Sequence, residues 1–164
     1  MSREVPMLFN EAMVKAILAG QKVVTRRPAS AVDVEAGDRL WVRETHWIGS
    51  LSHNSESQPC PPWGGLPYTV SPDGTLCAFF RAGFDRTQPR PWRPSIHMPR
   101  WASRLTLRVT SRRPGLVRDV DDAEARAEGF LGRAEFMAAW QSIYSDMPLC
   151  DVIRFEVLTT GGAS

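Results

Sequence analysis

The segment GQKVVTRRP, residues 20–28, places several residues that could do chemistry close together. Thr25 has a hydroxyl that could act as a nucleophile, but a free hydroxyl is weak and needs a neighbouring base. Lys22 could be that base only as a neutral amine, and burial beside Arg26 and Arg27 would lower its pKa in that direction. A solvated basic turn is the alternative, because the helix dipole alone favours a lysine after a helix C-terminus.

A short helix is predicted just before this segment. Asn10 is a suitable N-cap, and Met13 and Ile17 are four residues apart on one apolar face. Gly20 fits the left-handed position just past a helix C-terminus. The helix should therefore end just before Lys22.

The β-branched run Val23-Val24-Thr25 predicts an extended segment that ends at Pro28. Successive side chains of a strand point to opposite faces. Lys22 can therefore meet Thr25 only from the turn before the strand or from a bulge.

The rest of the chain alternates predicted strands and short helices. Strands are expected at residues 7–9, 39–45, 103–111 and 151–158, and a hairpin at 66–82 turns at Pro72-Asp73-Gly74. A helix should start at Asp121 or Asp122 and stop at Gly129, and a longer amphipathic helix is marked by Phe136, Trp140, Ile143 and Tyr144. Residues 46–65 and 83–96 look like irregular surface loops. This order predicts an α+β domain around a small curved sheet.

The composition is that of an ordinary globular chain. Its 164 residues carry a net charge of only +2, so the overall field does not point to nucleic acid. Neither a membrane-spanning apolar run nor a signal-peptide segment is visible, which favours a cytoplasmic location without a membrane partner. The three cysteines are irregularly spaced relative to His46, His53 and His97, so structural or free thiols are favoured over a metal site. No cofactor motif is present.

Two tryptophan–arginine pairs could contact a nucleic acid. Trp41 with Arg43, and Trp101 with Arg100, could stack on bases and bind phosphates. A tryptophan within a strand is also a common core residue, and both interpretations stay open. Pro99 restricts the backbone beside Arg100, which favours Arg100 as a phosphate or base contact.

ILAGQKVVTRRP resembles the signature of the ASCH domain, in which Gly-x-Lys is followed after two residues by Thr or Glu, any residue and Arg. Gly20, Lys22, Thr25 and Arg27 meet that pattern. The likeness continues in GDRLWVRET, SIHMPRWASRLTLRVT, DDAEARAEGF, WQSIYSD and VIRFEV. The likeness covers about residues 7–158 apart from 48–68 and 82–92. The matching blocks resemble those of ASCH-like proteins of bacteriophages and prophages.

The resemblance implies a PUA-like fold, a small mixed β-barrel with flanking helices. It implies one domain over residues 1–158, with loop insertions near 46–65 and 83–96 and a flexible tail at 159–164. It also implies a cleft of the kind in which related domains bind RNA or modified bases.

One branch of that superfamily resembles enzymes that remove the acetyl group from N4-acetylcytidine. Carried over by motif, the catalytic residues would be Lys22, Thr25 and Glu128. Glu128 could orient Lys22, hold a water or protonate the leaving amine. By periodicity alone it shares a helical face with Asp121 and Glu124, which favours a solvated position.

Three hypotheses follow. The first is an amidohydrolase of N4-acylated cytidine-type nucleosides or nucleotides, with Lys22, Thr25 and Glu128 as catalytic residues. Its substrate-binding candidates are Arg27, Arg43, Trp41, Arg100 and Trp101. The second is a non-catalytic module of phage origin that binds RNA or a modified base. The third is a phage accessory protein that binds a host factor through the long loops.

Overall fold

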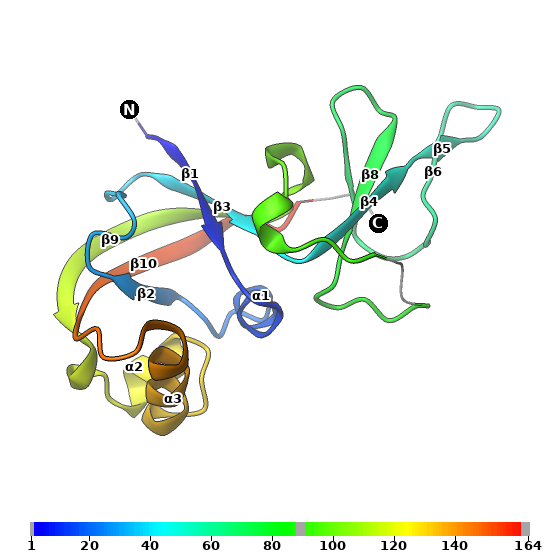
Figure 1. The fold of residues 1–164 in the computed structure, drawn as a ribbon. Coiled ribbons are helices and arrows are strands. Elements are labelled where there is room, and N and C mark those ends of the chain that lie inside the picture. The colour runs from blue at the N-terminus through cyan, green and yellow to red at the C-terminus, as the bar shows by residue number, and fades with distance from the viewer. Residues whose placement is uncertain (1, 88–90, 162–164) are drawn as a thin grey trace. The chain divides into compact units, whose positions relative to one another are not determined.

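The computed structural model describes residues 2–87 and 91–161, and within them the chain forms mixed β-sheets with three α-helices (Figure 1). This is the predicted α+β class. The helices are α1 (Glu11–Leu18), α2 (Asp122–Ala127) and α3 (Arg133–Tyr144). The strands are β1 (Glu4–Leu8), β2 (Val24–Pro28), β3 (Arg39–Arg43), β4 (His46–Ser50), β5 (Ser52–His53), β6 (Pro59–Cys60), β7 (Thr69–Val70), β8 (Leu76–Phe80), β9 (Thr106–Leu116) and β10 (Leu149–Thr159).

The chain divides into two compact units. Unit 1 consists of Met1–Val5, Ala16–Leu40 and Leu107–Val157. Unit 2 consists of Pro6–Lys15, Trp41–Thr106 and Leu158–Ser164. The chain passes from one unit to the other within β1, α1, β3, β9 and β10. The single domain over 1–158 that the sequence predicts stays a prediction.

The largest sheet has the strand order β1-β3-β9-β10-β2. In unit 1, β10 runs antiparallel to β2, with Asp151 opposite Arg27 and Ile153 opposite Thr25. Strand alternation predicts that Ile153, Phe155 and Val157 of β10 all face inward. Ile153 and Phe155 are buried, but Val157 is 40% exposed, so the prediction is wrong there. Residues 162–164 of the predicted flexible tail lie outside the described residues, and Thr159 belongs to β10.

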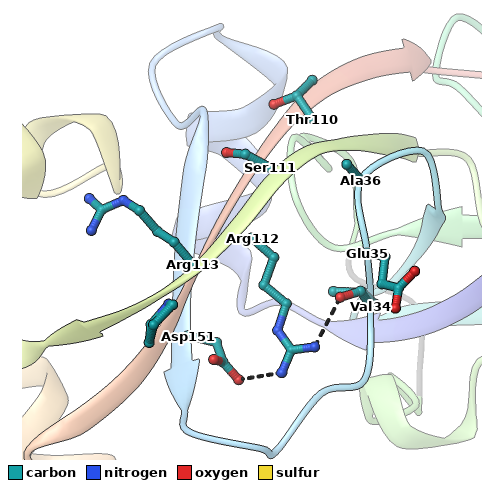
Figure 2. Close-up of a pocket in the computed structure, with 9 residues that line it drawn as sticks. Val34, Glu35, Ala36, Thr110, Ser111, Arg112, Arg113 and Asp151 are labelled. Carbon is teal, nitrogen blue, oxygen red and sulfur yellow. Dashed lines mark hydrogen bonds and ion pairs between the residues drawn. The ribbon is translucent and has the colours of Figure 1, made fainter.

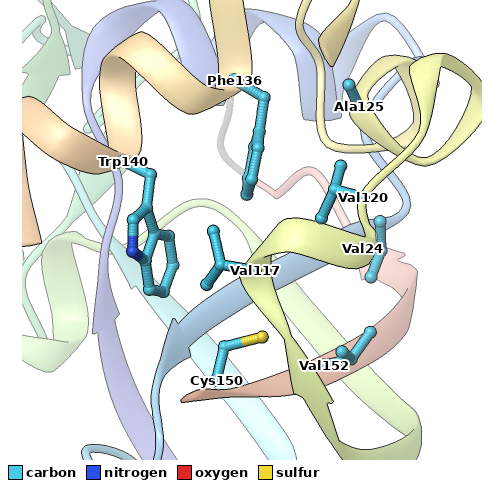
Figure 3. Packing of buried hydrophobic residues seen from close by; sticks show 8 residues of the cluster. All are labelled: Val24, Val117, Val120, Ala125, Phe136, Trp140, Cys150 and Val152. Atoms are coloured by element: carbon cyan, nitrogen blue, oxygen red, sulfur yellow. The ribbon is translucent and has the colours of Figure 1, made fainter. Parts of the chain in front are cut away.

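A hydrophobic cluster joins α2 and α3 to the strands of unit 1 (Figure 3). Phe136 and Trp140 of α3 point toward Val24, Val117 and Cys150 in that view. Both aromatic side chains are nearly fully buried, as the helical spacing predicts. This packing fixes α2 and β2. Thr25 lies on β2, Lys22 in the turn just before it, and Glu128 at the C-cap of α2.

The longer amphipathic helix is confirmed as α3, but of the four residues that mark it Ile143 does not lie on the buried face, because its side chain is 63% exposed. The ring centre of Tyr144 lies 4.6 Å from that of Trp140, and Tyr144 packs against the hydrophobic cluster at the last turn of α3. Tyr144 is half-buried, as expected for the end of an amphipathic helix.

In unit 2, the prediction of a surface loop over residues 46–65 is wrong at its start. His46–Ser50 forms β4, which pairs antiparallel with β8, and the His46 side chain is fully buried. The Ser, Asn, Pro and Gly residues that follow obscured this short strand in the sequence. The predicted hairpin is confirmed, since β7 pairs antiparallel with β8 and Gly74 has the positive φ that its turn requires.

Among the described residues, no helix is both long and apolar enough to cross a membrane.

Candidate functional site

Lys22 lies in the turn that joins α1 to β2. Gly20, with φ of +76°, ends the helix as predicted, and the backbone amide of Lys22 still donates to the Ala16 carbonyl at 3.1 Å. The next amide, that of Val23, donates to the carbonyl of Ala127 at the end of α2 at 2.9 Å. These bonds bring Lys22 beside the C-terminus of α2, more than one hundred residues away along the chain.

The amine of Lys22 is buried and surrounded by oxygen atoms. Its Nζ donates to the Val24 carbonyl at 2.9 Å, the Glu128 carbonyl at 2.8 Å and the Glu128 Oε2 at 2.9 Å. Only 2% of the residue is exposed. Three acceptors match the three N–H donors of an ammonium group, so this geometry holds the charged form.

Glu128 is buried at the C-cap of α2, so the prediction of a solvated side chain from periodicity is wrong. The helix ends one residue earlier, and Gly129 with φ of +97° turns the chain. Glu128 nevertheless keeps helical backbone angles, and its amide donates to the Glu124 carbonyl, so it stays on the helical face of Glu124. That face is covered by Lys22 and Arg26 instead of by solvent. Its Oε2 accepts from Lys22 and its Oε1 accepts from Arg26 Nη1 at 3.0 Å.

The ion pairs continue beyond Glu128. Arg26 Nη2 donates to Glu124 Oε2 at 2.5 Å, and Glu124 Oε1 accepts from Arg154 Nη2 at 2.8 Å. Lys22, Glu128, Arg26, Glu124 and Arg154 thus form a chain of alternating charges within unit 1. We call it the charge chain.

Burial lowers the pKa of Lys22 below its ordinary value of 10.5. The charge and hydrogen bond of Glu128 oppose that shift, while the positive charges of Arg27 and Arg26 add to it. Burial would also lower the pKa of Arg26, but Glu124 and Glu128 raise it overall. Lys22 is therefore easier to deprotonate than Arg26, its neighbouring cation in the charge chain.

Thr25 and Arg27 are two residues apart on β2 and their side chains contact each other. Thr25 is fully buried, and its Oγ1 accepts a hydrogen bond from Arg27 Nη1 at 3.0 Å. Burial lowers the pKa of Arg27. A cation that donates to a hydroxyl oxygen favours the deprotonated, alkoxide form of that hydroxyl. Unit 1 therefore contains all three predicted catalytic residues and Arg27.

The other binding candidates lie in unit 2. The guanidinium carbons of Arg43 and Arg100 lie 5.3 and 5.6 Å from the ring centre of Trp41, within the range of cation–π interaction. Arg43 also donates to the Met98 carbonyl at 3.1 Å, which fixes its side chain. Trp101 packs against the buried cluster around Met98, and that contact favours the core interpretation for Trp101.

Sequence reasoning missed Arg26, Glu124 and Arg154 as members of one site. The doubled arginine of TRRP was a signal for Arg26 only, since no spacing links β2 to α2 or β10. It also missed a cleft of about 490 Å³ in unit 1, lined by residues 34–36 and 110–114 and by Asp151 (Figure 2). On one side of this cleft, Arg112 donates to the Val34 carbonyl and to Asp151 Oδ2, each at 3.1 Å.

Within the part of the chain that the structure describes, no cluster of three His, Cys, Asp or Glu residues could hold a metal ion. Cys60 is exposed, while Cys77 and Cys150 are buried, and all three are free thiols.

No protein-family model and no curated protein matches the chain. Among solved structures, an ASCH domain from Lactobacillus crispatus JV V101 matches with a TM-score of 0.53. The match covers 96% of this chain and 80% of that one, at 12% sequence identity. The chain has the fold of an ASCH domain.

A DUF984 protein from Enterococcus faecalis V583 is also similar, with a TM-score of 0.41, 13% identity, and coverage of 97% of this chain and 77% of that one. The ASCH fold confirms the fold that the sequence motifs imply. At this level of identity the likeness extends to the fold alone, so a phage origin and the closed barrel stay predictions.

Proposed function

We propose that this protein is an amidohydrolase that removes an acyl group from N4-acylated cytidine-type nucleosides or nucleotides. The observation that carries the proposal is the buried pair of Lys22 and Glu128, whose Nζ and Oε2 atoms lie 2.9 Å apart. The side chains are only 2% and 4% exposed. Because burial lowers the pKa of Lys22, this amine is suited to accept a proton from a nucleophile.

In the proposed reaction, Thr25 Oγ1 bonds to the acyl carbonyl carbon while its proton passes to neutral Lys22. The bond between that carbon and N4 then breaks, and Lys22 gives the proton to the leaving amine. Water hydrolyses the resulting Thr25 ester, which releases the carboxylic acid and restores the hydroxyl. Arg27, which donates to Thr25 Oγ1, favours loss of the hydroxyl proton as Thr25 attacks.

Glu128 orients Lys22 in this scheme. A neutral amine has two N–H donors and one lone pair, so deprotonated Lys22 can keep two of these hydrogen bonds and take up a proton at the lone pair. Arg26 holds the other carboxylate oxygen of Glu128, so the carboxylate remains fixed when Lys22 changes its charge. Since Thr25 and Lys22 are buried, turnover requires a local opening that admits the substrate.

The proposal is tested by the absorbance change when N4-acetylcytidine or its deoxy form becomes cytidine or deoxycytidine. Wild type is compared with Thr25→Val, Glu128→Gln and Lys22→Met. The matched control is Arg108→Gln, which breaks the exposed Arg108–Glu156 pair of the same unit. Circular dichroism melting shows which variants remain folded.

Wild type and the Arg108 variant should convert the substrate, and the other three should be slower by about 10²-fold or more. Absence of conversion by folded wild type, or full activity of folded Lys22→Met, would overturn the proposal.

A second candidate function is a module that binds RNA or a modified base without chemistry. It is favoured by Trp41 in unit 2, a half-buried ring with two guanidinium groups near it. Fluorescence anisotropy of a labelled single-stranded RNA would show weaker binding by Trp41→Ala and unchanged binding by Lys22→Arg. RNA binding that ignores Trp41 would remove the support for this candidate.

A further inference from the structure

The charge chain extends beyond the residues that the proposed reaction uses. Arg26 separates Glu128 from Glu124, and Glu124 in turn contacts Arg154. In the proposed reaction neither Arg26 nor Glu124 touches a reacting atom. Their contacts nevertheless determine where the carboxylate of Glu128 lies.

Arg26 transmits geometry because a guanidinium group is planar and rigid. Nη1 donates to Glu128 Oε1 at 3.0 Å, and Nη2 donates to Glu124 Oε2 at 2.5 Å. The two carboxylates bind the same planar guanidinium group and fix its orientation. A change at Glu124 therefore rotates or releases the Arg26 donor that holds Glu128.

Glu124 is itself held in place. It lies in the first turn of α2, where its backbone amide donates to the N-cap carboxylate of Asp121 at 2.8 Å. Its second carboxylate oxygen accepts from Arg154 on β10. The position of Glu124 is therefore set by a capped helix and by the sheet, two rigid elements.

A groove of about 270 Å³ gives solvent access to this end of the charge chain. Its lining includes Arg26, Glu124 and Arg113. The Glu124 side chain is 28% exposed, whereas those of Lys22 and Glu128 are 2% and 4% exposed. A substitution at Glu124 therefore leaves water to solvate the vacated position, and the fold should tolerate it.

We infer that Glu124 is a positioning residue of the site, which acts through Arg26 to fix the carboxylate of Glu128 and, through it, the amine of Lys22. This inference rests on the proposed function. It predicts that a residue outside the three catalytic candidates controls the rate of the chemical step without binding substrate.

Several other charged or titratable groups act on the same residues. Arg27 adds positive charge near Lys22, and Tyr144 interacts with Arg27. The buried thiol of Cys150 interacts with both Arg26 and Glu128. None of these groups is changed by a substitution at Glu124, so a shift seen in that variant reports on the charge chain.

The test compares Glu124→Gln, which keeps the shape and removes the charge, with Glu124→Asp, which keeps the charge. Arg154→Gln is the matched control, because it removes the other partner of Glu124. Two readouts are needed. One is kcat and KM for N4-acetylcytidine. The other is the titration of the Lys22 side chain by NMR of protein labelled with ¹³C-lysine, in which only Lys15 and Lys22 contribute signals.

Glu124→Gln should lower kcat by about tenfold or more and leave KM within about twofold, since the loss is in positioning. Loss of a nearby negative charge should also move the Lys22 titration midpoint to lower pH. In Glu124→Asp the midpoint should return most of the way to its wild-type value. Arg154→Gln removes a positive charge, so its midpoint should stay or rise.

The two proposals fail in different ways. If wild type does not turn over, the proposed function fails, and the Lys22 titration alone decides the inference. A lower midpoint in Glu124→Gln but not in Arg154→Gln supports the link through Arg26. Equal midpoints in wild type and folded Glu124→Gln overturn it, as does an Arg154→Gln variant that matches Glu124→Gln in both readouts.

Discussion

The Lys22–Glu128 pair of unit 1 and the Glu44–Arg104 pair of unit 2 are both almost completely buried, but they differ in the cation. Arg104 binds Glu44 through two parallel bonds, Nε to Oε2 at 3.0 Å and Nη2 to Oε1 at 2.9 Å. Lys22 binds Glu128 through one side-chain oxygen and shares that carboxylate with Arg26.

The surroundings increase this difference. Arg104 also donates to the Ala82 carbonyl at 3.2 Å and lies 4.2 Å from the ring centre of Phe80. A guanidinium group does not lose its proton in proteins, so the Arg104 pair has one charge state for its cation. A lysine can change its charge when buried, and burial lowers the pKa of Lys22. The comparison separates a pair suited to structure from one suited to proton transfer.

Arg104→Met, which removes the cation of the unit 2 pair, should have the largest effect on stability. It leaves Glu44 buried without its partner, and breaking a buried pair in this way costs about 3 to 5 kcal/mol. Urea unfolding at pH 7 measures the loss. The double variant Glu44→Gln/Arg104→Met is the control, and it should recover much of the stability because no charge is left buried.

The loss should depend on pH. Burial raises the pKa of Glu44 above its ordinary value of 4.5 even with Arg104 present, and loss of Arg104 raises it further. A carboxyl whose folded pKa is raised stabilises the protein below its unfolded pKa, and this contribution is lost as pH rises through the folded pKa. The defect of Arg104→Met should therefore be smaller near pH 4.5 than at pH 7. A defect that is equal at both values would contradict this account of Glu44.

Lys22→Arg gives the pair in unit 1 the same kind of cation as the pair in unit 2. The positive charge remains, so the loss in free energy of unfolding should be limited to about 1 to 3 kcal/mol, the typical cost of a larger group in a packed site. Turnover of N4-acetylcytidine should nevertheless disappear, because arginine cannot act as the base. A folded Lys22→Arg variant with full activity would show that the amine is not the base.

The local elements near the site could be predicted from the sequence, because their signals are local. The Asn10 side chain caps α1 by accepting from the Met13 amide at 2.9 Å, and Asp121 caps α2 in the same way. Leu40, Val42, Leu105, Leu107 and Val109 are buried as strand alternation predicts.

The polar contacts could not be predicted by the same means. Glu128 is buried because Lys22 and Arg26, more than one hundred residues away in the sequence, cover its helical face, and periodicity within α2 does not contain that contact. Glu44 and Arg104 meet although sixty residues separate them, and no motif links the two. Such pairs depend on how strands far apart in the chain are brought together, which composition and spacing do not determine.

The most direct test of the account is the titration of Lys22 in the folded wild-type protein. The chain contains two lysines, so ¹³C-lysine labelling gives two side-chain signals, and Lys15→Gln assigns them. The titration midpoint of Lys22 should lie clearly below the ordinary value of 10.5, because burial, Arg26 and Arg27 outweigh Glu128. A midpoint at or above 10.5 would contradict it and would make Lys22–Glu128 a structural pair like Glu44–Arg104.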